Sequence, residues 1–276
     1  MRFEDIAYEA ADGVARITID RPEVRNALRT QTYRELTEAF RLAAEDEEVG
    51  VVVLTGRGDE AFCAGGDVRG QAERNPEIGR RHLRAVQALG VMMRGCGKPI
   101  IAAVRGYAVG GGHELHLFCD ITIAADNAKF GQVGPRVGSV PVWGATQMLA
   151  RMVGEKKARE MIYTCRLYDA AAAERMGLVN AVVPLGELDR EVGRWCQELL
   201  DKSPQCLRLA KLAMNFELDL LQPAYTHATE ILAMTYGSPE NMEGIRAFLE
   251  KRKPDFRKYR RRTVPAPAGG EAGDGR

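Results

Sequence analysis

The spacing of apolar side chains predicts a protein in which strands alternate with helices. Residues 13–22, "GVARITIDRP", alternate apolar and polar side chains up to a proline, which is typical of a strand. Residues 29–49 carry apolar side chains at helical spacing, with Leu36, Phe40 and Ala43 on one face. Residues 50–58, "GVVVLTGRG", form a β-branched run between glycines and predict a buried strand.

The alternation continues through the middle of the chain. Residues 69–94 predict a polar helix with an arginine-rich face. Residues 98–111, "KPIIAAVRGYAVGG", predict a second buried strand that leads into glycines, and residues 119–131, "CDITIAADNAKFG", predict a third. Strands that alternate with helices in this way indicate an α/β fold with a largely parallel sheet.

Helices dominate after Gly154. Their predicted ranges are 155–164, 169–177, 186–203 and 204–218, with one or two more helices between 224 and 252. We therefore expect a core with the active site over 1–203 and a C-terminal helical region over 204–260. The tail, 261–276, is rich in Pro, Gly and Ala and is expected to be disordered.

Composition narrows the class of protein. The chain has 276 residues, a formal net charge of +1 and 45% hydrophobic residues, so no global charge favours nucleic acid or a membrane as main partner. The N-terminal segment is acidic and mixed, unlike a targeting peptide, and no apolar run has membrane-spanning length. Six cysteines without a CxxC pair indicate reduced thiols, so we expect a cytoplasmic protein.

Residues 108–120, "AVGGGHELHLFCD", allow three kinds of site. A zinc helix needs H-E-x-x-H, but His113 and His116 are three apart and no third ligand has a recognisable spacing, so no metal site is predicted. A phosphate cradle needs one of the known glycine motifs, which are absent. Glycines after a buried strand let the backbone approach a ligand, and a helix that starts there favours negative charge.

A second loop supports the third alternative, an oxyanion hole. The segment Ala64-Gly65-Gly66-Asp67 also follows a predicted strand and is also built of small residues. Two such loops can direct two backbone N–H groups at one carbonyl oxygen, which stabilises an enolate or a tetrahedral oxyanion. Glu114 then lies beside the reacting carbon as acid or base.

With these motifs the chain resembles the enoyl-CoA hydratase/isomerase (crotonase) superfamily. The resemblance rests on "DRPEVRNAL", "FCAGGD", "GYAVGGGHEL", "CDITIAADNAKFGQ", "GEKKARE" and "AERMGLVNAVVP", in that order. It implies a spiral of ββα units with a helical C-terminal trimerisation region. It also implies homotrimers or hexamers, a CoA thioester as substrate, and no cofactor beyond the CoA of the substrate.

The resemblance assigns roles to residues of both loops. Gly66 and Gly111 are expected to supply the oxyanion-hole N–H groups. Residues expected to hold the CoA or the acyl group are Arg25, Ala27, Ala64, Gly65, Asp67, Gln132, Gly134 and Trp143. Lys251 is also expected to bind CoA, because it lies in a basic segment that in relatives often contacts the CoA phosphate of a neighbouring subunit. A solvated helix end explains that segment equally well.

The subfamily is harder to choose. Hydratases activate water with two glutamates; Glu114 matches the first, but Gly134 stands in place of the second. A glycine there is typical of 1,4-dihydroxy-2-naphthoyl-CoA synthases and 2-ketocyclohexanecarboxyl-CoA hydrolases, which the chain resembles most in overall pattern. Tyr236 matches a catalytic tyrosine of the synthases, some of which bind bicarbonate at the positions of Gln132 and Gly134.

The chain also departs from that branch. Both groups carry an aspartate and a tyrosine where this chain has Pro141 and Gly144, and Ile162 replaces a tryptophan that helps to hold bicarbonate. The hypothesis is therefore hydratase-type addition or elimination of water, with Glu114 as acid/base. Ring-opening hydrolysis or synthase chemistry is the alternative within enzymes. A non-catalytic or RNA-associated member, suggested by the basic run at residues 257–262, is the alternative outside them.

Overall fold

The computed structural model describes residues 3–260, and the predicted disordered tail lies outside these residues. Two sheets form its centre. The larger has the order β1-β2-β3-β5-β7-β10, in which every pair is parallel except β1 with β2. Its strands are β1 (Ile6–Ala11), β2 (Val14–Ile19), β3 (Val51–Gly56), β5 (Ile100–Val104), β7 (Ile121–Ala125) and β10 (Ala181–Val183).

The smaller sheet has the order β4-β6-β8-β9, and only β8 and β9 are antiparallel. Its strands are β4 (Ala61–Cys63), β6 (Tyr107–Val109), β8 (Lys129–Gly131) and β9 (Tyr168–Asp169). Three times in succession, one strand enters the large sheet and the next enters the small sheet before a helix follows. This repeated ββα pattern confirms the predicted α/β spiral.

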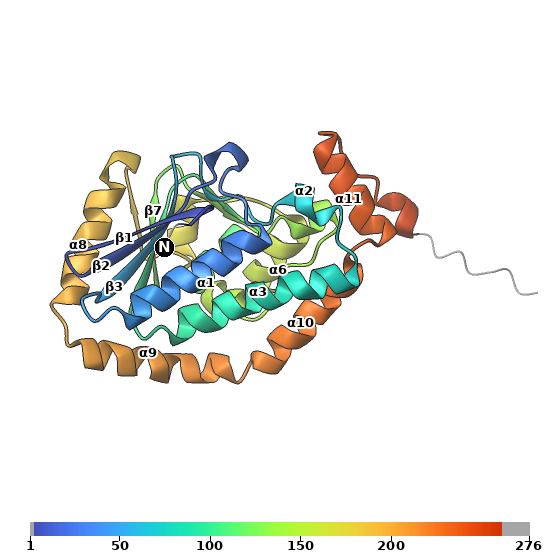
Figure 1. Cartoon of the computed structure of the whole chain (residues 1–276). Helices are drawn as coiled ribbons and strands as arrows, with labels where there is room; N and C mark the ends of the chain where they lie inside the picture. The colour runs from blue at the N-terminus through green and yellow to red at the C-terminus, as the bar shows by residue number, and fades with distance from the viewer. Residues whose placement is uncertain (1–2, 261–276) are drawn as a thin grey trace, which may run out of the picture.

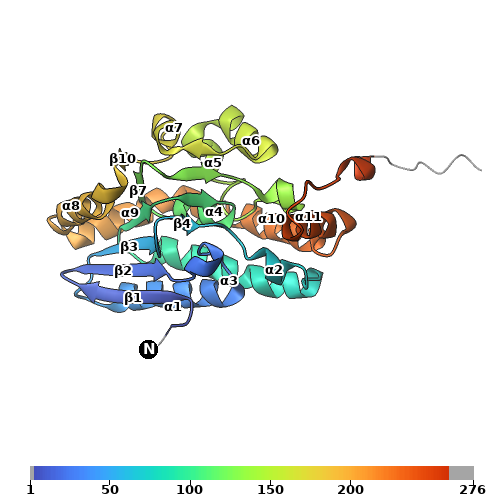
Figure 2. The same ribbon diagram turned by 90° about the horizontal axis from the view of Figure 1, so that it is seen from above.

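Helices cover both faces of the large sheet (Figures 1 and 2). Strand residues alternate between two cores: Val53, Ile101 and Ile123 pack under α8, whereas Leu54 and Ala102 belong to the larger core. The helices of the first half are α1 (Thr30–Glu45), α2 (Val68–Gln71), α3 (Pro76–Gly95) and α4 (Gly111–Leu117). Those of the second half begin with α5 (Leu149–Val153), α6 (Glu155–Thr164), α7 (Ala170–Arg175) and α8 (Leu188–Leu200).

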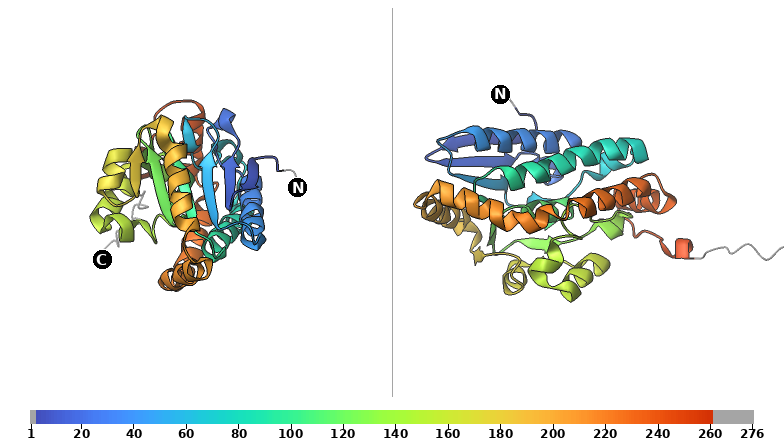
Figure 3. Two further views of the ribbon diagram at one scale, coloured as in Figure 1. Left: turned by 90° about the vertical axis from the view of Figure 1, so that its left-hand side faces the viewer. Right: turned by 90° about the horizontal axis from the view of Figure 1, so that it is seen from below.

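The C-terminal helices extend along the outside of the core. They are α9 (Pro204–Asp219), α10 (Gln222–Thr235) and α11 (Pro239–Leu249). The first two follow one another along one edge of the molecule, and α11 turns away from that edge to lie beside α2 (Figures 1 and 3). Short 3-10 turns complete the chain at Pro22–Val24, Gly134–Val137, Leu185–Glu187 and Arg257–Arg260. Because α10 packs on α3 and α11 on α2, chain segments far apart in sequence meet beside the glycine loops.

Three expectations about element boundaries were wrong. The single strand predicted over 119–131 is divided into β7 of the large sheet and β8 of the small sheet. The single helix predicted over 69–94 is divided into α2 and α3, because Asn75 takes an extended conformation before Pro76 and caps α3 by accepting from Ile78 N. The single strand predicted over 98–111 is divided as well. Gly106, with φ +60°, turns the chain out of the large sheet and into the small one.

Candidate active site

The two glycine loops lie next to each other because β4 and β6 are neighbours in the small sheet. A Cβ on Gly111 would lie 3.6 Å from the backbone nitrogen of Gly66. Gly65, with φ +93°, lets the first loop turn there, and a Cβ on it would lie only 2.9 Å from the carbonyl oxygen of Val109. Only glycines allow this close approach of the two backbones.

Both predicted oxyanion donors are available. Over the described range, 3–260, neither Gly66 N nor Gly111 N has a hydrogen-bond partner, whereas the flanking residues are tied down. Leu28 N donates to Gly65 O at 2.8 Å, and Asp67 N donates to Leu28 O at 2.9 Å. Gly111 is the first residue of α4, so its N–H has no partner inside the helix. Two backbone N–H groups without a partner among the described residues thus lie close together, as an oxyanion hole requires.

Glu114 lies one turn after Gly111, on the same face of α4. Its side chain is buried, and Oε1 accepts a hydrogen bond from Trp143 N at 2.6 Å. Burial raises the pKa of Glu114 to about 8, although backbone N–H groups of Trp143, Ala145 and Val142 oppose the rise. The carboxyl group can therefore both accept and donate a proton near neutral pH.

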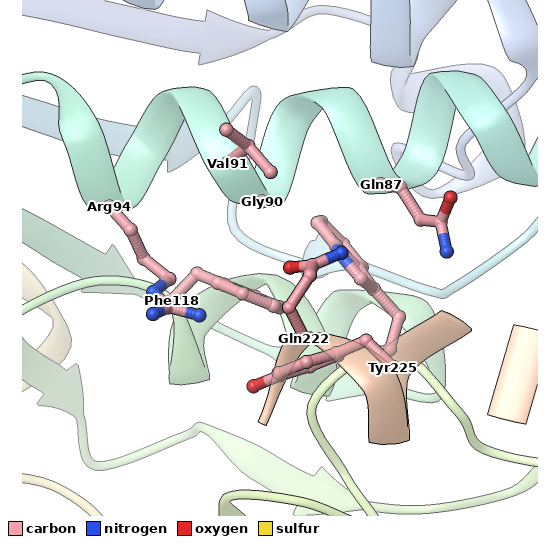
Figure 4. Close-up of a pocket in the computed structure, with 8 residues that line it drawn as sticks. Gln87, Gly90, Val91, Arg94, Phe118, Gln222 and Tyr225 are labelled. Atoms are coloured by element: carbon pink, nitrogen blue, oxygen red, sulfur yellow. The ribbon is translucent and has the colours of Figure 1, made fainter. Parts of the chain in front are cut away.

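The Trp143 side chain packs behind Glu114. Its ring stacks on Phe118 at a centroid distance of 4.8 Å and meets Tyr33 edge to face at 5.6 Å. On its far side lies a small cavity of about 20 Å³ between α3 and α10, lined also by Arg94 and Tyr225 (Figure 4). Trp143 thus contributes its backbone to the site, and its ring belongs to the core.

A much larger cavity, of about 910 Å³, opens beside the first glycine loop. The predicted substrate-binding residues that line it are Arg25, Ala27, Ala64, Asp67 and Lys251, and the predicted oxyanion donor Gly66 lines it too. Sequence reasoning missed Arg69 and Arg136, which line it too. Four cationic side chains around a cavity of this size suit the phosphates of a nucleotide-bearing ligand. Lys251 lines the cavity of its own chain, and Asp67 pairs with Arg21 and caps α2.

The two histidines beside Glu114 are fully enclosed by protein. His113 Nδ1 lies 3.0 Å from Gln132 Nε2, and His116 Nδ1 lies 3.3 Å from Thr122 Oγ1. Burial lowers the pKa of His113 to about 3. Both rings are therefore neutral at physiological pH. No group of three or more His, Cys, Asp and Glu side chains within residues 3–260 is arranged to hold a metal ion.

Gly134 lies in a 3-10 turn where its own chain crowds it. A Cβ on Gly134 would lie 3.1 Å from the carbonyl oxygen of Ser139 and 3.6 Å from Pro141 Cδ. Gln132, the other residue expected near a bound anion, is fully buried and points its amide nitrogen at His113. The structure therefore brings Glu114 to the glycine loops without a second carboxyl group from this segment.

Tyr236 follows the last residue of α10 and packs its ring against Gly79 of α3. It is buried, and its hydroxyl accepts a hydrogen bond from Arg74 at 3.4 Å. Burial raises its pKa, which Glu114 raises further and Arg74 lowers. Sequence reasoning missed Arg74 and Gln71, two buried polar residues next to the first glycine loop. The only sequence signal for Arg74 was its position, as a charged residue between a glycine loop and the start of a helix.

Comparison with known proteins agrees with this geometry. A sequence model described as Enoyl-CoA hydratase/isomerase matches residues 9–260. An enoyl-CoA hydratase from Mycobacterium avium subsp. paratuberculosis K-10 is 29% identical, with a TM-score of 0.84, over 92% of this chain and 99% of that one. An enoyl-CoA hydratase/isomerase from Xanthobacter autotrophicus Py2 is 33% identical, with a TM-score of 0.82, over 91% and 97%.

A third structure has higher sequence identity. The protein titled enoyl-CoA hydratase subunit I from Geobacillus kaustophilus HTA426 is 36% identical, with a TM-score of 0.74, over 92% of this chain and 98% of that one. All three likenesses extend over nearly the full length of both chains. Across the part of the chain that the structure describes, no helix is long and apolar enough to cross a membrane.

Proposed function

Because this chain belongs to the enoyl-CoA hydratase/isomerase family, we propose that it adds water to the double bond of an enoyl-CoA thioester, or removes it, with Glu114 as the single acid/base. The observation that carries the proposal is the position of one buried carboxyl group, with a pKa of about 8, one helical turn from two free backbone N–H groups. This arrangement combines enolate stabilisation with proton transfer.

In the proposed reaction, the thioester oxygen accepts hydrogen bonds from Gly66 N–H and Gly111 N–H. Ionised Glu114 takes a proton from a water molecule, whose oxygen bonds to Cβ while the electrons of the double bond form the enolate. The same carboxyl group then gives the proton to Cα, so that one water has been added in all. With a pKa of about 8, about a tenth of Glu114 is ionised at pH 7, which leaves both forms accessible.

One carboxyl group performs both transfers in this proposal because the chain places no second one near it from the 132–141 segment. Ser139 and Pro141 occupy the space beside Gly134. We also propose that no bicarbonate replaces the missing carboxylate. A carbonyl oxygen next to Gly134 repels an anion, and the Gln132 side chain is already engaged with His113.

The second candidate is ring-opening hydrolysis of a cyclic β-keto acyl-CoA. The buried Tyr236–Arg74 pair favours it, because these two donors can stabilise an oxyanion on a ring ketone. Water would add its OH to the ketone carbon, the ring C–C bond would break to leave a carboxylate and a thioester enolate, and the enolate would take a proton at Cα. Pro141 and Gly144 offer no acidic side chain for this route or for the synthase route.

The oligomeric state and the cellular compartment of the protein are part of the same proposal. We infer that the chain forms a homotrimer or a pair of trimers, because α9, α10 and α11 expose large apolar side chains: Leu209, Leu212, Met214, Phe216, Leu220, Ile231, Met234, Phe248 and Leu249. All six cysteines are free thiols, which fits a reducing cytoplasm. Light scattering coupled to gel filtration measures the assembly, and a monomeric mass contradicts it.

The first experiment incubates the purified protein separately with crotonyl-CoA and 2-ketocyclohexanecarboxyl-CoA, each with and without bicarbonate. Both products gain one water, so they are separated by chromatography against 3-hydroxybutyryl-CoA and pimeloyl-CoA. We expect bicarbonate-independent 3-hydroxybutyryl-CoA. If pimeloyl-CoA is the only product, the second candidate replaces the first. If neither substrate is turned over, both candidates are contradicted. Dependence of either reaction on bicarbonate overturns the proposal that no anion takes part.

The matched variants are Glu114→Gln and Glu35→Gln. Glu35 is also a buried carboxyl group, but it accepts hydrogen bonds from the backbone of Glu4 and Asp5, away from the glycine loops. Loss of a general acid/base costs roughly 10²- to 10⁴-fold in rate, so we expect that loss in Glu114→Gln and near-native turnover in Glu35→Gln. Near-native turnover of Glu114→Gln shows that another group is the base.

A further inference from the structure

Arg74 is a buried arginine without a carboxylate partner. Its residue is 7% exposed, and none of the ion pairs found among residues 3–260 includes it. Asp67 of the first glycine loop pairs with Arg21, Glu243 of α11 pairs with Arg252, and Glu73, the neighbour of Arg74 in sequence, is exposed. A guanidinium keeps its charge under all physiological conditions, so burying it unpaired is costly unless another anion compensates it.

Two further polar groups accompany this cation. One guanidinium nitrogen donates to Tyr236 Oη at 3.4 Å, and the guanidinium carbon lies 5.5 Å from the centre of the tyrosine ring. Gln71 is 8% exposed, and its buried Oε1 has no hydrogen-bond partner among the described residues. Arg74 N donates to Gln71 O, which joins the two residues in one turn. We call Gln71, Arg74 and Tyr236 the acyl-end cluster.

The acyl-end cluster lies against the oxyanion hole. Gln71 Nε2 lies 2.9 Å from the position that a Cβ on Gly66 would take. On the other side, the Tyr33 hydroxyl lies 3.2 Å from the position of a Cβ on Gly111. Burial, Cys63 and Glu114 raise the pKa of Tyr33 well above 10, and Arg74 is near enough to oppose them. The acyl-end cluster therefore adjoins the oxyanion hole through the Gln71 amide, which Arg74 N joins by way of Gln71 O.

Within residues 3–260 no carboxylate of the site forms an ion pair with Arg74. Glu114, the carboxyl group at the centre of the site, is mostly protonated at neutral pH because burial raises its pKa to about 8. Arg74 lines neither the large cavity that suits CoA nor the small cavity behind Trp143. CoA phosphates held in the large cavity therefore lie apart from this cation. The remaining source of an anion is the acyl group itself.

We propose that the acyl-end cluster selects acyl-CoA thioesters whose acyl group ends in a carboxylate, with Arg74 forming the ion pair. The planar guanidinium matches a carboxylate with two parallel hydrogen bonds, and the Gln71 amide and Tyr236 hydroxyl supply further donors. This inference rests on the proposed acyl-CoA function and narrows its substrate class. It holds for both candidate reactions, since ring opening itself creates such a carboxylate.

The test measures binding rather than turnover, so it is independent of whether the enzyme hydrates crotonyl-CoA. Calorimetric titration compares succinyl-, glutaryl-, adipyl- and pimeloyl-CoA with saturated analogues in which an isopropyl group replaces each terminal carboxylate. The isopropyl group has the same branching and a similar size, and it carries no charge. A charge-assisted hydrogen bond changes binding roughly 10- to 100-fold, so we expect one or more chain lengths to favour the carboxylate by that factor.

Three variants separate selection from a structural role. In Arg74→Met the preference is expected to vanish, and in Arg74→Lys part of it is expected to remain. Arg84→Met, which changes an exposed arginine of α3, is expected to retain it. Binding of free CoA, in a cavity that Arg74 does not line, reports that each variant is folded.

Two outcomes overturn the proposal. One is equal binding of charged and neutral analogues by the native enzyme at every chain length, since this comparison needs no variant to fold. The other is an unchanged preference of Arg74→Met for the carboxylate ligands, which shows that another group selects them. If Arg74 only ties its loop to Tyr236, Arg74→Met is less stable and the ratio of affinities does not change.

Discussion

The ionisation of Glu114 is expected to destabilise the folded protein as the pH rises. In the folded state its pKa is about 8, because burial disfavours the charged carboxylate, whereas its ordinary value is 4.5. Between these two values the folded chain binds more protons than the unfolded chain. The stability that Glu114 contributes is therefore fully present below pH 4.5 and is lost as the pH rises through about 8.

The magnitude follows from the same two values. One pKa unit corresponds to about 1.4 kcal/mol, and integration from pH 5 to pH 8.5 gives a loss of about 4 kcal/mol in the free energy of unfolding. Glu114→Gln removes this term and keeps a side-chain oxygen that can accept from Trp143 N. All other titrating groups are the same in both proteins, so the difference between them isolates Glu114.

The assay is urea unfolding of both proteins at pH 5.0, 6.5, 7.5 and 8.5, at one fixed protein concentration because of any oligomer equilibrium. We expect the two to differ little at pH 5, and the glutamine variant to gain about 4 kcal/mol over the native protein by pH 8.5. Glu35→Gln serves as control, since no comparable gain is expected. Parallel pH profiles of native protein and Glu114→Gln refute the claim that this carboxyl group is held neutral.

Two further predictions concern the glycines and the large cavity. Gly112→Ala places a Cβ 2.1 Å from the Cys63 carbonyl oxygen and is expected to lower the free energy of unfolding by about 3 kcal/mol or more in the same denaturation assay. Gly193 is exposed in α8 with open space around it, so Gly193→Ala is expected to raise that free energy by roughly 0.5–1 kcal/mol. The reverse order contradicts the packing of α4 on β4. Lys251→Ala is expected to raise KM for an acyl-CoA substrate about two- to fivefold at low salt, with kcat unchanged and the effect reduced at high salt. Lys202→Ala, outside the cavity, is the control, and an equal KM in both variants argues against a CoA site there.

Hydrophobic pattern alone predicted the inner strands β2, β3, β5 and β7 of the main sheet and most helices, but neither edge strand, β1 nor β10. Residues 51–56 are all buried, and a continuous β-branched run of that kind fits a strand covered on both faces. The short strands of the small sheet were not predicted individually, because β4, β6, β8 and β9 have two or three residues each. Such runs are too short for periodicity to define, and they form only where neighbouring strands are already in place.

The candidate site also has a part that the sequence predicted and a part that it did not. The two glycine loops and Glu114 were expected from local sequence, because glycines after strands and a carboxyl group one turn into a helix carry their chemistry locally, and the family resemblance then assigned Gly66 and Gly111 as the donors. The pKa of Glu114 was not accessible, since it depends on enclosure and on N–H groups of residues 142–145. These arrive from a loop about thirty residues later, which no local pattern places.

Arg74 illustrates what only the tertiary structure decided. Its neighbours in sequence, "QAERNPE", are polar and predict an exposed segment. Its burial arises because α10 and α11 return to α3 and α2, and Tyr236 then covers the guanidinium. The sequence determined which residues can do chemistry, because side-chain type and local spacing are properties of the chain. The fold decided which of them share a low-dielectric space, because that depends on contacts between residues far apart along it.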